Sequence, residues 1–169
     1  MNKILQLSLL SVLLLSCEDK PAISSVAPVN WETREAKAIG FDSLEQGSSY
    51  LSVYSQIYSQ TEHIKHNLTA TISMRNTSRK DTIYLSKAAY FDTHGAFLRS
   101  YFDNAIFIAP METVEIVIDE IDQIGGTGAN FVFDWYIPKN TSEPIFEAVM
   151  ISTSGQQGLS FSTQGKRIE

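Results

Sequence analysis

Residues 129–137, Ala-Asn-Phe-Val-Phe-Asp-Trp-Tyr-Ile ("ANFVFDWYI"), show the clearest β-strand pattern in this sequence. Successive side chains of a β-strand point to opposite faces, so apolar residues at a period of two predict a strand with one buried face. The large apolar side chains that share one face here are Phe131, Phe133, Trp135 and Ile137. We therefore expect this segment to be a core strand.

The same alternation returns along most of the chain. It is plain in "NLTATISMRN" (67–76) and "ETVEIVID" (112–119), and "FEAVMIST" (146–153) and "LSFST" (159–163) are two more β-rich runs. Polar and glycine-containing segments separate the runs, as turns do. We find about eight or nine short strands and no long helical period, which predicts an all-β immunoglobulin-like β-sandwich over residues 48–169. An up-and-down β-barrel is the alternative.

The N-terminus has the layout of an export signal. Lys3 precedes an apolar run over residues 4–15, which is shorter than the roughly twenty residues of a membrane-spanning helix. The run ends in Leu14-Leu15-Ser16-Cys17, which resembles a bacterial lipobox, the motif whose cysteine receives a diacylglycerol. We therefore expect a signal peptide over residues 1–16 and a membrane anchor of fatty acids such as palmitate on Cys17. This places the protein in the bacterial cell envelope, on the periplasmic side or at the cell surface.

Composition limits the partners. The chain has 13 Lys and Arg against 19 Asp and Glu, a net charge of −6, and no basic block. Nucleic-acid binding needs clustered cations, so nucleic acid is not an expected partner. Cys17 is the single cysteine, so the domain must be stabilised by its core rather than by a disulfide.

Residues 17–47 are predicted to be a tether between the anchor and the domain. They contain two prolines and show no sustained strand or helix period. Trp31 and Phe41 are the exceptions, because large aromatic groups are more stable when covered. We expect part of the tether to pack on the domain through these two residues.

Four stretches resemble the bacterial family called domain of unknown function 3124: "LTATISMRNTS", "YFDTHGAFLRSYFD", "GGTGANFVFDW" and "EAVMISTSGQQGLSFSTQGK". The resemblance covers about residues 48–168. It implies a small exported or lipid-anchored protein without an assigned activity. It supplies no catalytic residues, so none is transferred to this chain.

A row of tyrosines is the first candidate binding surface. In "YLSVYSQIYSQ" (50–60), Tyr50, Tyr54 and Tyr58 would share one face of a strand, with serine and glutamine between them. Flat rings with hydroxyl groups suit sugar or peptide binding. The alternative is that the rings cover the edge of the sandwich or pack under the tether.

Two glycine-rich loops form the second candidate site, with Gly126, Gly128 and Asn130 in one and Gln156 and Gln157 in the other. A strand follows the first loop, whereas a dinucleotide fingerprint requires a helix there, so no nucleotide is expected. Asp119, Glu120 and Asp122 look like a solvated loop end. His63, His66 and His94 lack the spacing of a metal site, and we expect no metal or cofactor.

These features predict a lipid-anchored envelope protein whose β-sandwich is a non-catalytic binding module. Its partner would be another envelope protein or a glycan. Two alternatives remain open at this stage. One is an unrecognised hydrolase, in which Asn130, Gln156 or Gln157 would converge with an acid at one end of the sandwich. The other is a purely structural spacer, which predicts no concave site.

Overall fold

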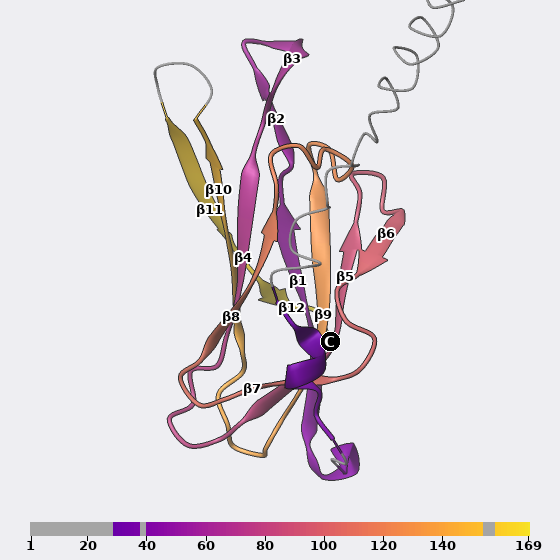
Figure 1. The fold of residues 1–169 in the computed structure, drawn as a ribbon, viewed down its shortest axis with the longest axis vertical. Helices are drawn as coiled ribbons and strands as arrows, with labels where there is room; N and C mark the ends of the chain where they lie inside the picture. The colour runs from indigo at the N-terminus through magenta and orange to yellow at the C-terminus, as the bar shows by residue number, and fades with distance from the viewer. Residues whose placement is uncertain (1–28, 38–39, 154–157) are drawn as a thin grey trace, which may run out of the picture.

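A computed structural model describes residues 29–37, 40–153 and 158–169, and these residues form two β-sheets packed face to face (Figure 1). The predicted all-β sandwich is confirmed, because the sheets remain two layers and do not close into a barrel. Within the described residues, none of the helices is long and apolar enough to cross a membrane.

Six strands form the larger sheet, in the order β12(Lys166–Arg167), β1(Glu45–Val53), β9(Ala129–Ile137), β5(Ile83–Phe91) and β6(Phe97–Ser100), with β7(Ile106–Ile108) also paired to β5. The smaller sheet has the order β11(Leu159–Gln164), β10(Ile145–Ser152), β4(Thr69–Arg75) and β8(Thr113–Ile118). A separate hairpin, β2(Gln56–Ser59) and β3(Thr61–Asn67), projects from one end (Figure 1). The described residues thus form more strands than the predicted eight or nine, since edge pieces as short as β12 lack a readable period.

Two pairs of strands alternate between the sheets along the chain. β4 pairs with β8 in the four-stranded sheet, and β5 pairs with β9 in the six-stranded sheet. Immunoglobulin sandwiches have the same inner pairing. The outer strands differ, because here β1 pairs with β9 and β10 pairs with β4. The first long strand consequently lies beside the centre of the six-stranded sheet.

Aromatic rings join the two sheets at the centre of the core. Phe131 and Phe133 on β9 have centroids 5.3 Å apart, and Phe133 stacks on Phe146 of the opposite sheet at 4.2 Å. Tyr90 on β5 extends the stack, 4.8 Å from Phe131. All four side chains are buried. The period-two pattern of residues 129–137 is therefore confirmed as the inner face of a central strand.

Trp135 needs a glycine opposite to it. Gly47 is its register partner on β1, and a methyl group at Gly47 would overlap the indole ring. The buried indole Nε1 donates a 3.0 Å hydrogen bond to the Ser49 hydroxyl. Arg167 of β12 covers the outer side of the ring at 5.1 Å. This contact seals the edge of the sandwich beside β1.

Asn76 organises the loops that follow β4. Its side-chain amide donates to three backbone carbonyls, those of Asp81, Ile108 and Ala109, at 2.8–3.0 Å. Its side-chain oxygen accepts from the backbone N–H of Ser78 at 2.9 Å. Loop carbonyls that the interior would otherwise leave unpaired are thereby satisfied.

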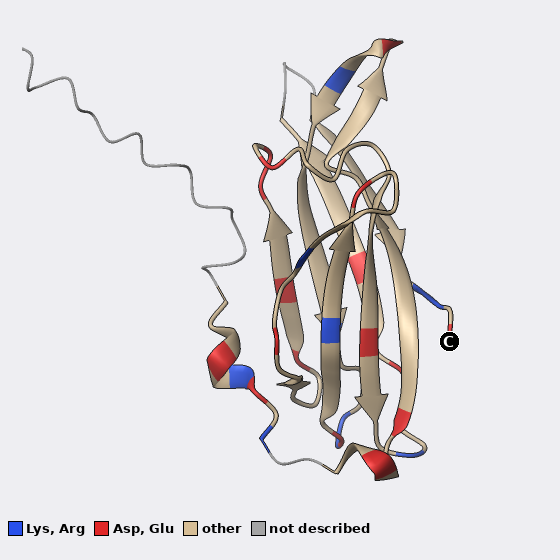
Figure 2. Ribbon diagram, turned by 90° about the vertical axis from the view of Figure 1, so that its right-hand side faces the viewer, with Lys and Arg blue, Asp and Glu red and all other residues tan. Residues whose placement is uncertain are grey.

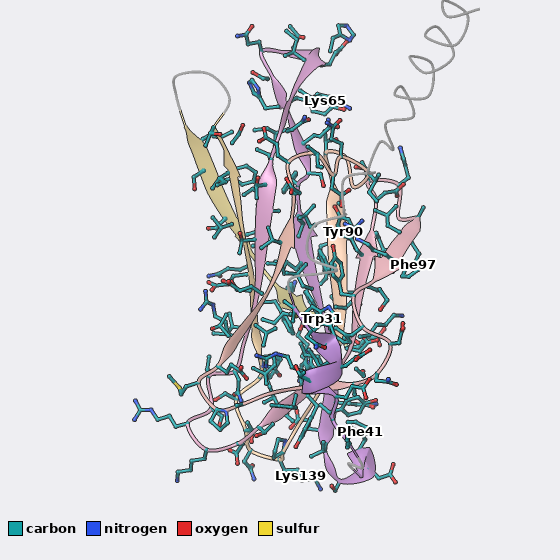
Figure 3. All side chains as sticks on the ribbon, in the orientation of Figure 1. Trp31, Phe41, Lys65, Tyr90, Phe97 and Lys139 are labelled. Carbon is teal, nitrogen blue, oxygen red and sulfur yellow. The ribbon has the colours of Figure 1, made fainter. Side chains whose placement is uncertain are left out.

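The described part of the predicted tether packs on the domain, as expected from its aromatic residues (Figure 3). Trp31, in the short 3-10 helix η2(Trp31–Arg34), lies 5.4 Å from Phe102. Phe41, in η3(Phe41–Ser43), lies 4.7 Å from Tyr136. Arg34 adds an ion pair with Glu112 at 2.7 Å. β1 also begins at Glu45, inside the range assigned to the tether.

Replacing Phe133 with alanine should lower the free energy of unfolding by about 3–5 kcal/mol, because it leaves a cavity between the sheets. Urea denaturation followed by tryptophan fluorescence measures this change. Val149→Ala is the matched control, since Val149 is 43% exposed on the four-stranded sheet and should lose about 0.5 kcal/mol or less. Equal losses in the two variants would contradict the central role of the aromatic stack.

Candidate functional site

The outer face of the six-stranded sheet carries a row of polar side chains across its central strands. Because Phe133 and Trp135 point into the core, their neighbours Asp134 and Tyr136 on β9 face outward. Their register partners on β1 are Ser48 for Asp134 and Gln46 for Tyr136. Directly opposite residues of antiparallel strands lie close enough for their side chains to touch.

A pocket of about 360 Å³ lies over this row, and we call it the sheet pocket. Its volume is at the lower end of the range for small-molecule sites, about 300–1,000 Å³. The residues that line it are Gln46, Gly47, Ser48, Ser86, Asp134, Trp135, Tyr136 and Glu169. Three strands and residue 169 thus build one concave polar surface.

Asp134 is the best-positioned charged group in the sheet pocket. The Ser48 hydroxyl donates a 2.5 Å hydrogen bond to its Oδ1. Its Oδ2 forms no hydrogen bond among the described residues, and the side chain is half-buried. The Ser86 hydroxyl donates to the backbone carbonyl of Asp134 at 3.3 Å. The carboxylate is therefore held in place with one oxygen available as an acceptor.

Tyr136 forms the aromatic wall of the sheet pocket. Phe41 packs against its ring at 4.7 Å, and Phe41 also makes an edge contact with Tyr84 on β5 at 6.3 Å. This contact comes from the segment before β1, labelled at the lower end of Figure 3. A ring braced in this way offers a flat apolar surface beside hydrogen-bonding groups, a combination that suits polar ligands with apolar faces.

The predicted tyrosine row is not one strand face, and this expectation was wrong. β1 ends at Val53 and β2 begins at Gln56, so the chain bends between Tyr50 and Tyr58. Tyr54 packs half-buried against Phe161 at 5.7 Å. Tyr58 lies 56% exposed in the hairpin. Of the three tyrosines, Tyr50 lies on the outer face of the six-stranded sheet, where it is 37% exposed and two residues after Ser48 on β1.

The bend arises because Ser55 is needed inside. Its hydroxyl shares a 2.9 Å hydrogen bond with the Tyr90 phenol, and both side chains are buried. Its backbone N–H donates to the Gly126 carbonyl at 3.1 Å. These contacts pull residue 55 out of the strand direction. The alternation in residues 50–60 gave no sign of them.

The glycine-rich loop that contains Gly126 and Gly128 is held by hydrogen bonds to other residues of the chain. Gly126 has a φ of +73° and accepts from the backbone N–H groups of Ser55 and Gln56 at 3.1 Å. Gly128 donates from its N–H to the Thr93 hydroxyl at 2.9 Å. Asn130 already belongs to β9, on the outer face of the six-stranded sheet. The described residues of this loop are thus held by hydrogen bonds to Ser55, Gln56 and Thr93.

Three predicted site residues lie outside the described residues: Cys17, Gln156 and Gln157. Residues 154–157 connect β10 and β11, which belong to the four-stranded sheet, whereas Asn130 lies on the six-stranded sheet. Convergence of these amides with an acid stays a prediction. Lipid attachment at Cys17 also stays a prediction.

Asp122 corrects the expectation of a solvated acidic loop end. Its carboxylate forms an ion pair with Arg99, and the two side chains are 7% and 14% exposed. Arg99 also donates to the Tyr101 hydroxyl at 3.0 Å and stacks over the Tyr90 ring at 5.2 Å. Burial alone would lower the pKa of Arg99, but Tyr101 and Asp122 together raise it. Sequence distance concealed this pair, since 23 residues separate its members.

The histidines do not gather into a metal site within the described residues, where no cluster of three or more His, Cys, Asp or Glu could hold an ion. His63 and His66 lie on β3 of the projecting hairpin. Figure 2 shows Lys and Arg in separate parts of the ribbon, and consecutive basic residues occur at Arg79-Lys80 and Lys166-Arg167.

Comparison with known proteins identifies the family of this chain. A family model described as "Protein of unknown function (DUF3124)" matches residues 46–168, and the chain belongs to this family. The chain is similar to the crystal structure of Thermotoga maritima 1070, with 8% sequence identity and a TM-score of 0.46. The similarity covers 71% of this chain and 92% of the Thermotoga maritima chain. Among curated proteins, none matches the chain.

Titration of Tyr90 gives a testable pH dependence. Desolvation by burial raises the pKa of its phenol from 10.0 to about 12, although the bond to Ser55 lowers it in part. The folded protein therefore keeps a proton that the unfolded chain loses. This contribution to stability is complete below pH 10 and is lost as the pH rises toward about 12.

We expect the free energy of unfolding to fall by about 2–3 kcal/mol across this pH interval through Tyr90 alone. Urea unfolding at a series of pH values from 8 upward measures the slope. Tyr90→Phe removes the titrating group, so its slope should be shallower than that of the unaltered protein. Identical slopes would show that another group is responsible.

Proposed function

We propose that the protein is a lipid-anchored bacterial envelope protein whose β-sandwich binds an envelope glycan without catalysing a reaction. The observation that supports binding is the sheet pocket, where Asp134, Ser48 and Gln46 surround the braced ring of Tyr136. Hydrogen-bonding groups beside an aromatic face match the two surfaces of a sugar ring. A pure spacer would have no use for such a pocket.

The anchor rests on the sequence alone. The charged start, the short apolar run and Leu14-Leu15-Ser16-Cys17 together support lipid attachment to Cys17. A single acyl chain binds a membrane only marginally, whereas two or more hold firmly. The sandwich would then work close to the membrane, where envelope glycans and proteins are concentrated.

A protein partner is the second candidate, and the hairpin β2–β3 favours it. The two strands pair with each other and with neither large sheet. Tyr58 and Ile64 are 56% and 45% exposed on it, and Lys65 lies over the Tyr58 ring at 5.4 Å. Figure 3 labels Lys65 in this hairpin, at the end of the molecule far from Phe41. Exposed aromatic and aliphatic groups of this kind occur in protein interfaces.

Cys17→Ser should abolish the anchor, because a hydroxyl is a far weaker nucleophile than a thiol near neutral pH. We expect the unaltered protein to enter the detergent phase of a phase-separation assay and the variant to stay in the aqueous phase. Intact-mass measurement should show the added acyl chains on the unaltered protein only. A protein isolated from the cell with a free Cys17 thiol and the leader still attached would refute the anchor.

Ser86→Phe should fill the sheet pocket and reduce retention of solubilised envelope glycan on the immobilised full chain by at least about tenfold. Thr71→Phe, on the outer face of the four-stranded sheet, is the matched control and should retain glycan normally. Thermal unfolding of both variants checks that they are folded. Equal retention by the two variants would remove the sheet pocket as the binding site.

A further inference from the structure

We infer that the sheet pocket selects ligands that bring hydrogen-bond donors, and that its ligand is a sugar carrying a free, positively charged amine held by Asp134. This inference rests on the proposed function, because it names the chemical class of ligand for the same site. Asp134 is its specificity-determining residue.

The groups that line the sheet pocket are mainly acceptors. The carboxylates of Asp134 and Glu169 are hydrogen-bond acceptors, whereas the serine hydroxyls and the amide of Gln46 can both donate and accept. None of the lining residues in the described part of the chain is Lys or Arg. A ligand carboxylate would therefore face two like charges, whereas an ammonium group would be attracted by both.

The position of Asp134 makes it the group that meets the amine. Ser48 occupies Oδ1 at 2.5 Å and fixes the rotamer of the side chain. Oδ2 has no hydrogen bond among the described residues. A fixed carboxylate loses little conformational entropy when a ligand binds, and a bond from an ammonium group is roughly twice as strong as a neutral one.

The neighbouring cations leave this carboxylate available. Lys87 is the register partner of Asp134 on β5, and Lys166 is the partner of Tyr50 on β12. Neither forms an ion pair with Asp134 in the described part of the chain. Arg167 is held by Glu143 at 2.5 Å and Glu45 at 3.6 Å. The cations thus flank the sheet pocket without forming an ion pair with Asp134 in the described part of the chain.

The ring of Tyr136 supplies the second half of the recognition. Phe41 packs against this ring at 4.7 Å. Tyr136 is the register partner of Gln46 and follows Asp134 on the same face of β9. The C–H face of a sugar stacks on such a ring, while the amine and hydroxyls reach the acceptors around it. Together, platform and carboxylate distinguish an amino sugar from a simple amine.

Isothermal titration of the full chain, purified in mild detergent, tests this with glucosamine, glucose, N-acetylglucosamine and glucuronate. We expect glucosamine to bind about tenfold more tightly than glucose and N-acetylglucosamine, and glucuronate to bind weakest. Asp134→Asn keeps an acceptor of similar shape but removes the charge, so it should abolish the preference for glucosamine. Glu115→Gln, on the other sheet, loses the same charge and should keep that preference.

The outcomes separate the inference from the proposed function. Equal binding of the four sugars, or tighter binding of glucuronate, would overturn the amine preference and leave a glycan-binding pocket in place. Preference for glucosamine that survives Asp134→Asn would overturn the role of Asp134. Failure of all four sugars to bind overturns the amino-sugar inference. The proposed function is refuted as well only if the unaltered protein, the reference in the Ser86→Phe experiment, also fails to retain envelope glycan.

Discussion

The stack of aromatic rings through the centre of the sandwich is the contact on which the rest of the structure depends. Phe133 of β9 lies against Phe146 of the opposite sheet at 4.2 Å, and Phe131 and Tyr90 continue the stack within the six-stranded sheet. Aromatic groups bury large areas, so these rings supply much of the apolar burial that joins the layers. The domain has no disulfide to share this task.

Fixing the inner face of β9 also fixes its outer face. A one-residue slip would move Asp134 into the core and Phe133 into solvent, so the register is strongly specified. Gly47 and Trp135 add a second constraint, because only that pairing leaves room for the indole ring. The polar row over β1 and β9 is thus a consequence of core packing.

The family has no assigned function, so the function of this chain has to be argued from the geometry of its site. A β-sandwich hosts many unrelated functions, so the fold makes no prediction about chemistry. Two charged sites of this protein differ in how they are held. Arg99 and Asp122 are nearly buried and neutralise each other, which ties their loops to the core. Asp134 is held by the neutral hydroxyl of Ser48 rather than by a cation, which is why we propose it for binding.

The strand pattern could be predicted from the sequence, since the alternation of residues 129–137 is a local property. The packing of Trp31 and Phe41 on the domain and the family that matches residues 46–168 could also be predicted from the sequence. Three features could not be predicted: the nearly buried ion pair of Asp122, the bend at Ser55, and the contact of Asp134 with Ser48 across 86 residues. Those outcomes depend on which strands become neighbours, and strand pairing is set by the packing of the whole core rather than by any local period.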